Sequence, residues 1–177
     1  LLLSSLESFA TQPANTVKAS AGYGLKILAT NWGFEGSMDA FCVKAKKEGY
    51  DGIENWWPGT KQEQDEMYAA LKKYNLELGI LYGAGEDAAS ENLQVFKKTM
   101  EEIVRQTSQK PLYINLHSGH DYFSFEEGKK FVEYTNALAK STGIPIYHET
   151  HRGRLMFAAH ITNEYIKKYP ELKLTLD

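Results

Sequence analysis

The sequence has few of the features that would indicate a disulfide-rich, membrane-spanning or nucleic-acid-binding protein. Its 177 residues include one cysteine, Cys42, so no disulfide can form within the chain and cysteine usage does not indicate a redox compartment. No apolar run reaches the eighteen or more residues that a membrane span needs. Lys and Arg number 20 against 23 Asp and Glu, and a net charge of −3 provides no broadly basic surface for nucleic acid. We therefore expect neither a membrane nor a nucleic acid as partner.

The N-terminal segment differs in composition from the rest of the chain. Residues 1–10 begin with an apolar run, and a segment rich in Ser, Thr, Ala, Gln and Asn follows. One interpretation is the remnant of an export signal, and the alternative is an irregular chain end or a short terminal helix. We predict a tail over residues 1–21 and one domain over residues 22–177. Because the two interpretations stay open, the location is either cytoplasmic or exported to a compartment such as the periplasm.

Strand-like and helix-like segments alternate through the whole of the predicted domain. Apolar strand patterns occur at 24–30, 51–55, 76–82, 112–117, 144–149 and 172–176, and helical spacing occurs at 37–47, 61–74, 91–106, 124–140 and 156–169. This alternation is typical of a parallel sheet with helices packed outside it. The turn after the first strand, residues 31–36, lacks the glycine fingerprint of dinucleotide-binding sheets, and no P-loop occurs. The sequence therefore favours an α/β fold of the parallel (β/α)₈ TIM-barrel type, of which only about six βα units are present.

Several predicted strands end in polar side chains that alternation places on the same face of the sheet. Alternation along each strand places the aliphatic residues toward the helices and the other set toward the barrel axis. At the carboxyl ends, the second set contains Glu54, His117, Glu149 and Asp177. Converging carboxylates repel one another, and a divalent cation (Mn, Mg, Co or Zn) is the usual remedy with Asp, Glu and His as ligands. For Glu54 an ion pair with Lys26 is the alternative, and His117 is either a ligand, a substrate contact or a structural residue.

The segment after the fifth strand is rich in imidazole and guanidinium groups. His151 follows Glu149 by two positions and can face the same opening, whereas alternation places His148 on the helix side as a structural residue. Arg152 and Arg154 can bind an anion or sugar hydroxyls, or one of them can be a solvated loop cation. The aromatic residues Trp32, Trp56 and Trp57 follow the first two strands, where they can stack on a sugar ring or close the barrel end.

The run His-Glu-Thr-His-Arg-Gly-Arg at 148–154, together with Leu-Thr-Leu-Asp at 174–177, resembles the xylose isomerase-like TIM barrels, and among them the sugar phosphate isomerases and epimerases. The resemblance implies a divalent metal held by Glu149 and Asp177, with a further His and Glu from a seventh and an eighth strand. It also implies catalysis by Glu149 as ligand and base, and we add His117 as a second catalytic candidate. The chain departs from this pattern because strands seven and eight are absent, which suggests a truncated barrel or a second copy that covers the gap in a homo-oligomer.

The function that we expect is a metal-dependent sugar isomerase or epimerase that abstracts a proton next to a carbonyl. Its substrate is a small sugar or sugar derivative, bound by Glu54, Trp32, Trp56, His151, Arg152 and Arg154. Three alternatives stay open: a lyase or hydrolase acting on keto-sugars with the same metal site, a barrel like that of the abasic-site endonucleases, and a non-catalytic sugar-binding module. The lack of a glycine-rich phosphate cradle slightly favours an unphosphorylated substrate.

Overall fold

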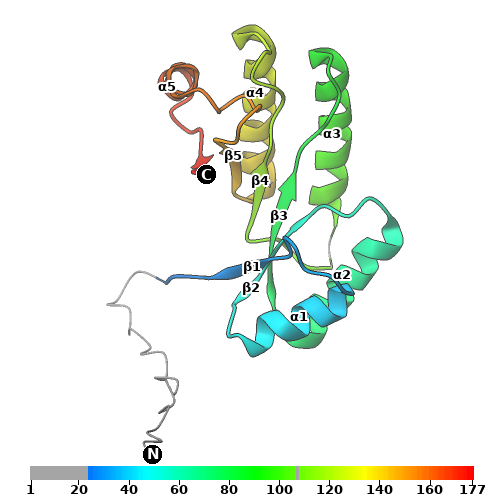
Figure 1. The fold of residues 1–177 in the computed structure, drawn as a ribbon. Coiled ribbons are helices and arrows are strands. Elements are labelled where there is room, and N and C mark those ends of the chain that lie inside the picture. Colours follow the sequence, from blue (N-terminus) through cyan, green and yellow to red (C-terminus); the bar gives the residue numbers. More distant parts are fainter. Residues whose placement is uncertain (1–23, 107) are drawn as a thin grey trace, which may run out of the picture.

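A computed structural model describes residues 24–106 and 108–177, and within these ranges six parallel strands alternate with five helices (Figure 1). The strands are β1 (Leu28–Thr30), β2 (Gly52–Trp56), β3 (Glu77–Tyr82), β4 (Tyr113–Leu116), β5 (Ile146–Glu149) and β6 (Leu174–Thr175). The helices are α1 (Met38–Lys47), α2 (Lys61–Tyr74), α3 (Ala89–Arg105), α4 (Phe125–Thr142) and α5 (Ala159–Lys168). The predicted tail over residues 1–21, with its possible export signal, lies outside the described residues.

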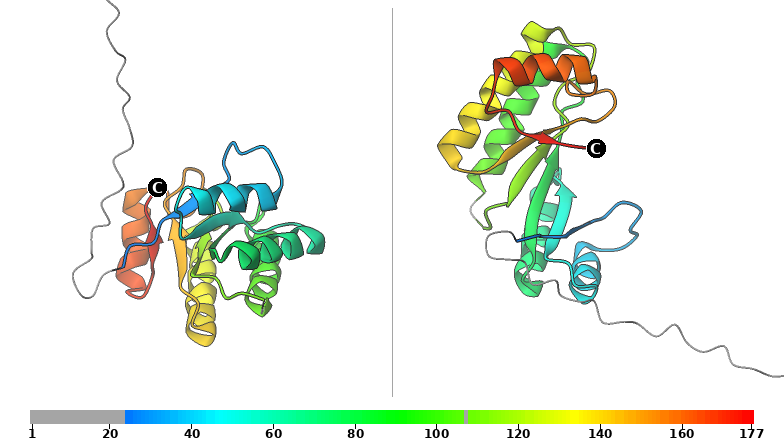
Figure 2. Two further views of the ribbon diagram at one scale, coloured as in Figure 1. Left: turned by 90° about the horizontal axis from the view of Figure 1, so that it is seen from below. Right: turned by 90° about the vertical axis from the view of Figure 1, so that its left-hand side faces the viewer.

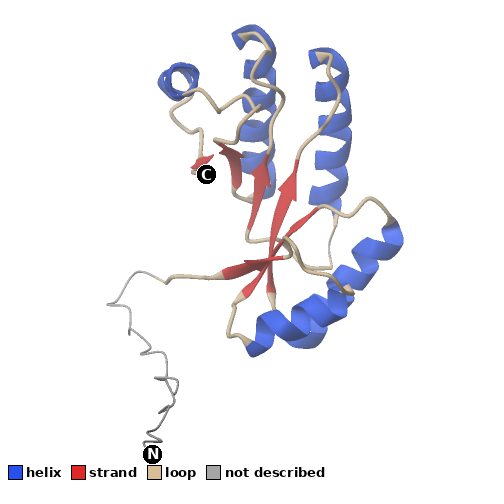
Figure 3. Cartoon of the chain, viewed as in Figure 1, coloured by secondary structure: helices blue, strands red, loops and turns tan. Residues whose placement is uncertain are grey.

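The six strands form one sheet in the order β1-β2-β3-β4-β5-β6, with every neighbouring pair parallel. The sheet is strongly curled, so that β1 crosses the direction of β4 and β5 in Figure 1, and the helices follow one another around its outer side. Figure 3 shows the same separation of strands and helices, and the views from below and from the side in Figure 2 show the helices wrapped around the sheet. This is the curled half of an α/β barrel, as the sequence predicted.

Capping residues determine where several of the helices begin and end. Thr60 and Ser124 each form a capping box with a glutamate three residues later, which satisfies free amide groups at the starts of α2 and α4. Asn75 and Gly143 end the same two helices in the left-handed conformation. Ser37 caps α1 by accepting a hydrogen bond from the amide of Ala40. These residues fix the lengths of the crossovers between strands.

The hydrophobic core lies between the outer face of the sheet and the helices. Its strand side chains alternate along each strand as the sequence predicted, and its helix side chains come from the apolar stripes of the helices. The largest fully buried members include Ile53, Leu78, Ile80, Ile114, Leu116, Phe96, Met100 and Phe131. Consequently the opposite, concave face carries the polar and aromatic strand residues.

Three predicted elements, β1, β6 and α5, are shorter in the structure by three or more residues than the sequence indicated. The first strand begins at Leu28 rather than at residue 24, and Leu25 and Ile27 are 84% and 53% exposed. Because β1 is an edge strand with a neighbour on one side only, these two side chains are not covered, and the expectation that they face the helices is wrong. Strand β6 has two residues, and α5 begins at Ala159 rather than at residue 156. Within the described ranges, none of the helices combines the length and apolar character needed to cross a bilayer.

Candidate active site at the carboxyl ends of β4 and β5

A buried carboxylate, Glu149, lies at the carboxyl end of β5. Its side chain belongs to a residue with 9% exposure, and its Oε2 accepts a hydrogen bond of 2.5 Å from the amide of Asn115 on β4. The Nε2 of His117 lies 3.3 Å from the same oxygen but is not aligned as a hydrogen bond. Both contacts use Oε2, which leaves Oε1 as the oxygen available to a ligand. Sequence alternation correctly placed Asn115, His117 and Glu149 on one face, but it did not single out Asn115 as the partner of Glu149.

The imidazole of His117 is held between two other rings. Trp56 meets it edge to face at a centroid distance of 5.1 Å, and His151 lies over it at 4.4 Å. Burial lowers the pKa of His117, the negative charge of Glu149 opposes this shift, and the charge of His151 adds to it. Burial is the leading cause, so the imidazole is held mainly in its neutral form, with Nε2 free of any hydrogen-bond partner among the described residues.

A glycine directly after β3, Gly83, allows the backbone at the end of the next strand to approach this site. A Cβ atom on Gly83 would lie 2.7 Å from both the Cβ and the carbonyl oxygen of His117. These atoms belong to a strand end and cannot move away cheaply. Gly83 therefore helps to set the position of His117.

Replacing Gly83 with Ala is expected to shift His117, to destabilise the fold by about 1–3 kcal/mol and to lower any activity at this site. Urea denaturation and the chemical shifts of the His117 ring measure both effects. Gly85→Ala is the matched control, because a Cβ there meets no atom within 4 Å and the backbone is not left-handed. Equal effects of the two substitutions would contradict the role given to Gly83.

A second polar pair lies deeper on the concave face. The hydroxyl of Tyr113 donates a hydrogen bond of 2.7 Å to Oε2 of Glu54, and the ring of Tyr147 meets that of Tyr113 edge to face at 5.9 Å. Lys26 pairs with Glu77 rather than with Glu54, so the ion pair considered from the sequence is wrong. Glu54 thus occupies the concave face as expected, with a tyrosine as its partner.

His148 points to the helix side of the sheet and is structural, as the sequence predicted. Its Nδ1 lies 2.7 Å from the hydroxyl of Ser118, and its Nε2 lies 2.9 Å from the hydroxyl of Thr135 on α4. The Thr135 hydroxyl donates to the helix carbonyls of Phe131 or Val132, so its oxygen can accept from Nε2–H. Burial lowers the pKa of His148 to about 4, which keeps the ring neutral.

The remaining candidates from the sequence lie outside the cluster formed by Asn115, His117, Glu149, Trp56 and His151. Arg154 donates from Nη1 to the carbonyls of Ala84 at 3.1 Å and Gly119 at 3.2 Å, so these loop contacts engage part of its guanidinium. Arg152 is exposed, and Trp32 is 68% exposed beside α1. Asp177 is exposed beyond β6, and its backbone amide donates to the hydroxyl of Thr150.

The donors at this site match a divalent cation in kind but not in number. The buried Glu149 carboxylate and the unpartnered Nε2 of His117 are both donors that could bind a cation. Within residues 24–106 and 108–177, however, no three His, Cys, Asp or Glu side chains are arranged to hold a metal ion. The described residues therefore supply at most part of a ligand set.

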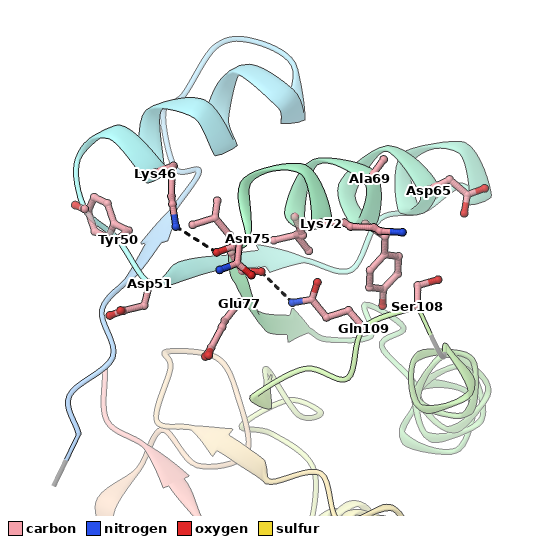
Figure 4. Close-up of a pocket in the computed structure, with 14 residues that line it drawn as sticks. Lys46, Tyr50, Asp51, Asp65, Ala69, Lys72, Asn75, Glu77, Ser108 and Gln109 are labelled. Atoms are coloured by element: carbon pink, nitrogen blue, oxygen red, sulfur yellow. Dashed lines mark hydrogen bonds between the residues drawn. The ribbon is translucent and has the colours of Figure 1, made fainter.

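A larger hollow lies at the other end of the strands and is distinct from this site. It has a volume of about 960 Å³ and is lined by residues that precede β2 and β3 and by one face of α2 (Figure 4). Lys46 and Gln109 donate there to the carbonyls of Asn75 and Leu76. Chemistry in parallel α/β folds is placed at the carboxyl ends of the strands, so this hollow is not our candidate active site.

Comparison with known proteins shows the fold of this chain but does not assign it to a family. No family described from sequences matches the chain, and no curated protein does either. Among solved structures, the chain is similar to the crystal structure of the probable 3-DHS dehydratase AsbF, involved in petrobactin synthesis, from Bacillus anthracis. The TM-score is 0.63 and the identity is 19%, over 86% of this chain and 63% of that one. The chain thus spans less than two thirds of AsbF, and the likeness shows the α/β half-barrel fold alone.

Proposed function

We propose that this chain carries part of the active site of a divalent-metal-dependent sugar isomerase or epimerase of the xylose isomerase-like type. The observation that supports this most strongly is the buried carboxylate of Glu149, fixed by Asn115 at the carboxyl end of a barrel strand. A carboxylate that is held by one oxygen and free at the other is suited to remove a proton from a substrate carbon.

The residues of the cluster have separate tasks in this proposal. Glu149 takes the proton next to the substrate carbonyl with Oε1, while Asn115 holds Oε2. His117 binds a sugar oxygen through its unpartnered Nε2, and the ring of Trp56 keeps that imidazole oriented. His151 covers the same imidazole and limits its contact with water. The proton is removed more easily in this setting because the base is preorganised rather than solvated.

The proposal includes a divalent metal for which Glu149 would be one ligand and Asp177 a second, and further donors would come from outside the described residues. A bound divalent cation would polarise the substrate carbonyl and stabilise the negative charge left by proton removal. Addition of Mn²⁺ is expected to broaden the resonances of Glu149 and His117 before those of Glu54. Unchanged spectra at millimolar Mn²⁺ would contradict a metal site at this position.

A dehydratase of oxidised sugars or cyclic keto-acids is the second candidate. The solved structure that resembles this chain is described as a probable 3-DHS dehydratase, and removal of water next to a carbonyl can begin with the same proton abstraction. The two candidates therefore share Glu149 as base and differ in the group that leaves.

Incubation with a panel of ketoses, aldoses and keto-acids in D₂O distinguishes the candidates. An isomerase or epimerase would incorporate deuterium at the carbon next to the carbonyl and would yield an isomer of the substrate. A dehydratase would yield new olefinic proton signals with loss of water. Absence of exchange, isomerisation and water loss for every compound, with Mn²⁺, Mg²⁺, Co²⁺ or Zn²⁺ present, would contradict both.

Replacing Asn115 with Leu is expected to release Glu149 and to leave its Oε2 buried without a donor. Loss of a hydrogen bond to a charged group costs about 1.5–3 kcal/mol, so the urea midpoint should fall accordingly. Any turnover should fall by tenfold or more, because the base is no longer oriented. Gln62→Leu serves as the control, since among the described residues its side-chain amide donates only to the exposed Glu66. Equal stability and turnover in N115L and the parent protein would show that Asn115 does not position Glu149.

A further inference from the structure

The guanidinium of Arg154 lies at the carboxyl ends of the strands, close to His117 of the candidate site. Its Nη1 donates hydrogen bonds to the carbonyls of Ala84 at 3.1 Å and Gly119 at 3.2 Å. Gly119 follows His117 by two residues, and Ala84 follows the glycine that packs against His117. Burial is the main cause of the lowered pKa of His117, and the positive charge of Arg154 contributes to it. Arg154 thus borders the site but has no part in the proton abstraction proposed above.

The two contacts of Nη1 leave one edge of the Arg154 guanidinium free. Both hydrogens of Nη1 are directed at main-chain carbonyls, so the N–H groups of Nε and Nη2 remain. Among the described residues neither Nε nor Nη2 has a hydrogen-bond partner, and neither atom is buried, so a ligand in solution can reach both. Nε and Nη2 lie on the same side of the planar group and present two parallel donors.

The positive charge of Arg154 has no counterion within the described ranges. None of the ion pairs there includes Arg154. The carboxylate of Asp87, on the loop after β3, instead accepts a hydrogen bond of 3.3 Å from the hydroxyl of Tyr122. Burial lowers the pKa of Arg154, and the phenol of Tyr122 opposes this shift. A charge that is partly removed from water without a partner is costly, so an anionic ligand is expected beside this guanidinium.

The free edge of Arg154 suits a carboxylate better than a phosphate. Two parallel N–H donors match the two oxygens of a carboxylate, which such an edge binds in a bidentate manner. The carbonyl oxygens of Ala84 and Gly119 beside the guanidinium carry partial negative charge and would repel a dianion more strongly than a monoanion. The same two carbonyls hold the guanidinium in place before any ligand binds, so less affinity is lost to conformational entropy.

We propose that the free Nε–Nη2 edge of Arg154 binds a carboxylate of the substrate, which is therefore a sugar acid or another small hydroxy- or keto-acid rather than a neutral sugar. This inference rests on the proposed function, because that function supplies the substrate. Arg154 binds and orients the acid, whereas Glu149 removes the proton. The site thereby distinguishes acidic substrates from neutral ones through a single side chain.

Glycolate, ethylene glycol and inorganic phosphate are the probes for a test by NMR titration at fixed pH and ionic strength, without added metal. Glycolate should produce saturable shifts of the Arg154 side chain and of the Gly119 amide. Ethylene glycol replaces the carboxylate with a hydroxymethyl group and should shift the same signals roughly tenfold less at equal concentration. Equal shifts from glycolate and ethylene glycol, or shifts without saturation, would overturn the proposal. Phosphate binding as tight as that of glycolate would overturn the assignment of a carboxylate.

The variant R154K keeps the positive charge but loses the parallel donors, so it should weaken glycolate binding by about tenfold. R105K is the matched control, because Arg105 is exposed on the last turn of α3, where it pairs with Glu101, and it should leave binding unchanged. Unchanged binding in a folded R154K protein, or equal weakening by R154K and R105K, would overturn the role of Arg154. Circular dichroism checks the folding of both variants, and the titration of the parent protein tests the proposal without either of them.

Glycolate has no ketone or aldehyde group and is not turned over, so its binding is separate from the proposed reaction. Saturable glycolate binding without deuterium exchange, isomerisation or water loss in the D₂O experiment would remove the proposed function and leave an anion site at Arg154. Turnover of neutral sugars in a protein that does not bind glycolate would keep the proposed function and overturn this inference.

Discussion

Glu149→Gln is expected to lower kcat/KM by about 10³-fold, the range that general acid–base catalysis contributes when a positioned base is removed. The amide keeps the shape of the carboxylate but cannot accept the substrate proton. Its loss of charge also weakens any cation at the site, so added Mn²⁺ should no longer broaden the His117 resonances. Turnover is measured on the substrate that the D₂O experiment identifies.

Glu164→Gln is the matched control for this prediction, because Glu164 is an exposed residue of α5 without a hydrogen bond to another described side chain. It should retain the activity of the parent protein within twofold. Folding of both variants is checked by circular dichroism. Full activity in a folded E149Q protein would remove Glu149 as the base, and with it the proposed function.

His148→Ala is expected to destabilise the protein by about 3 kcal/mol, from the cavity left in the core together with the loss of both hydrogen bonds. His148 is 1% exposed, and its ring lies between the hydroxyls of Ser118 and Thr135. Thr135 keeps its helix carbonyls as partners, whereas the buried Ser118 hydroxyl would lose its only described one. The free energy of unfolding is measured by urea denaturation.

His160→Ala tests whether the loss comes from burial rather than from removal of any histidine. His160 is exposed on α5, so its substitution should change stability by less than about 0.5 kcal/mol. A loss below about 1 kcal/mol for His148→Ala would contradict the structural role of this residue.

Regular periodicity made most of the fold predictable from the sequence. The bounds of α2, residues 61–74, follow from its apolar spacing, and the parallel alternation of strands and helices follows from the same kind of pattern. The ends of β1 and α5 were less predictable because they depend on tertiary neighbours. Nothing in the residues 24–27 shows that this segment precedes an edge strand with one partner.

The sequence predicted on which face of the sheet the residues of the candidate site lie, but not which of their side chains contact one another. Strand alternation placed Asn115, His117 and Glu149 on the concave face, but which side chain donates to Glu149 depends on the register between β4 and β5. That register pairs Asn115 with Tyr147, which lies two residues before Glu149 on the same face of β5. The main-chain contacts of Arg154 depend on the paths of two other loops, which no local pattern in the sequence encodes.

The order of strands in the sheet, which is also their order along the chain, has a consequence for how the molecule assembles. Each strand pairs with the one made just before it, after a single crossover helix. A growing polypeptide can therefore add one βα unit at a time to an existing edge, without waiting for a distant partner to emerge from the ribosome. Assembly of this kind closes one crossover at a time, and it leaves the growing edge exposed for no longer than one unit takes to be synthesised, whereas β1 keeps a neighbour on one side only.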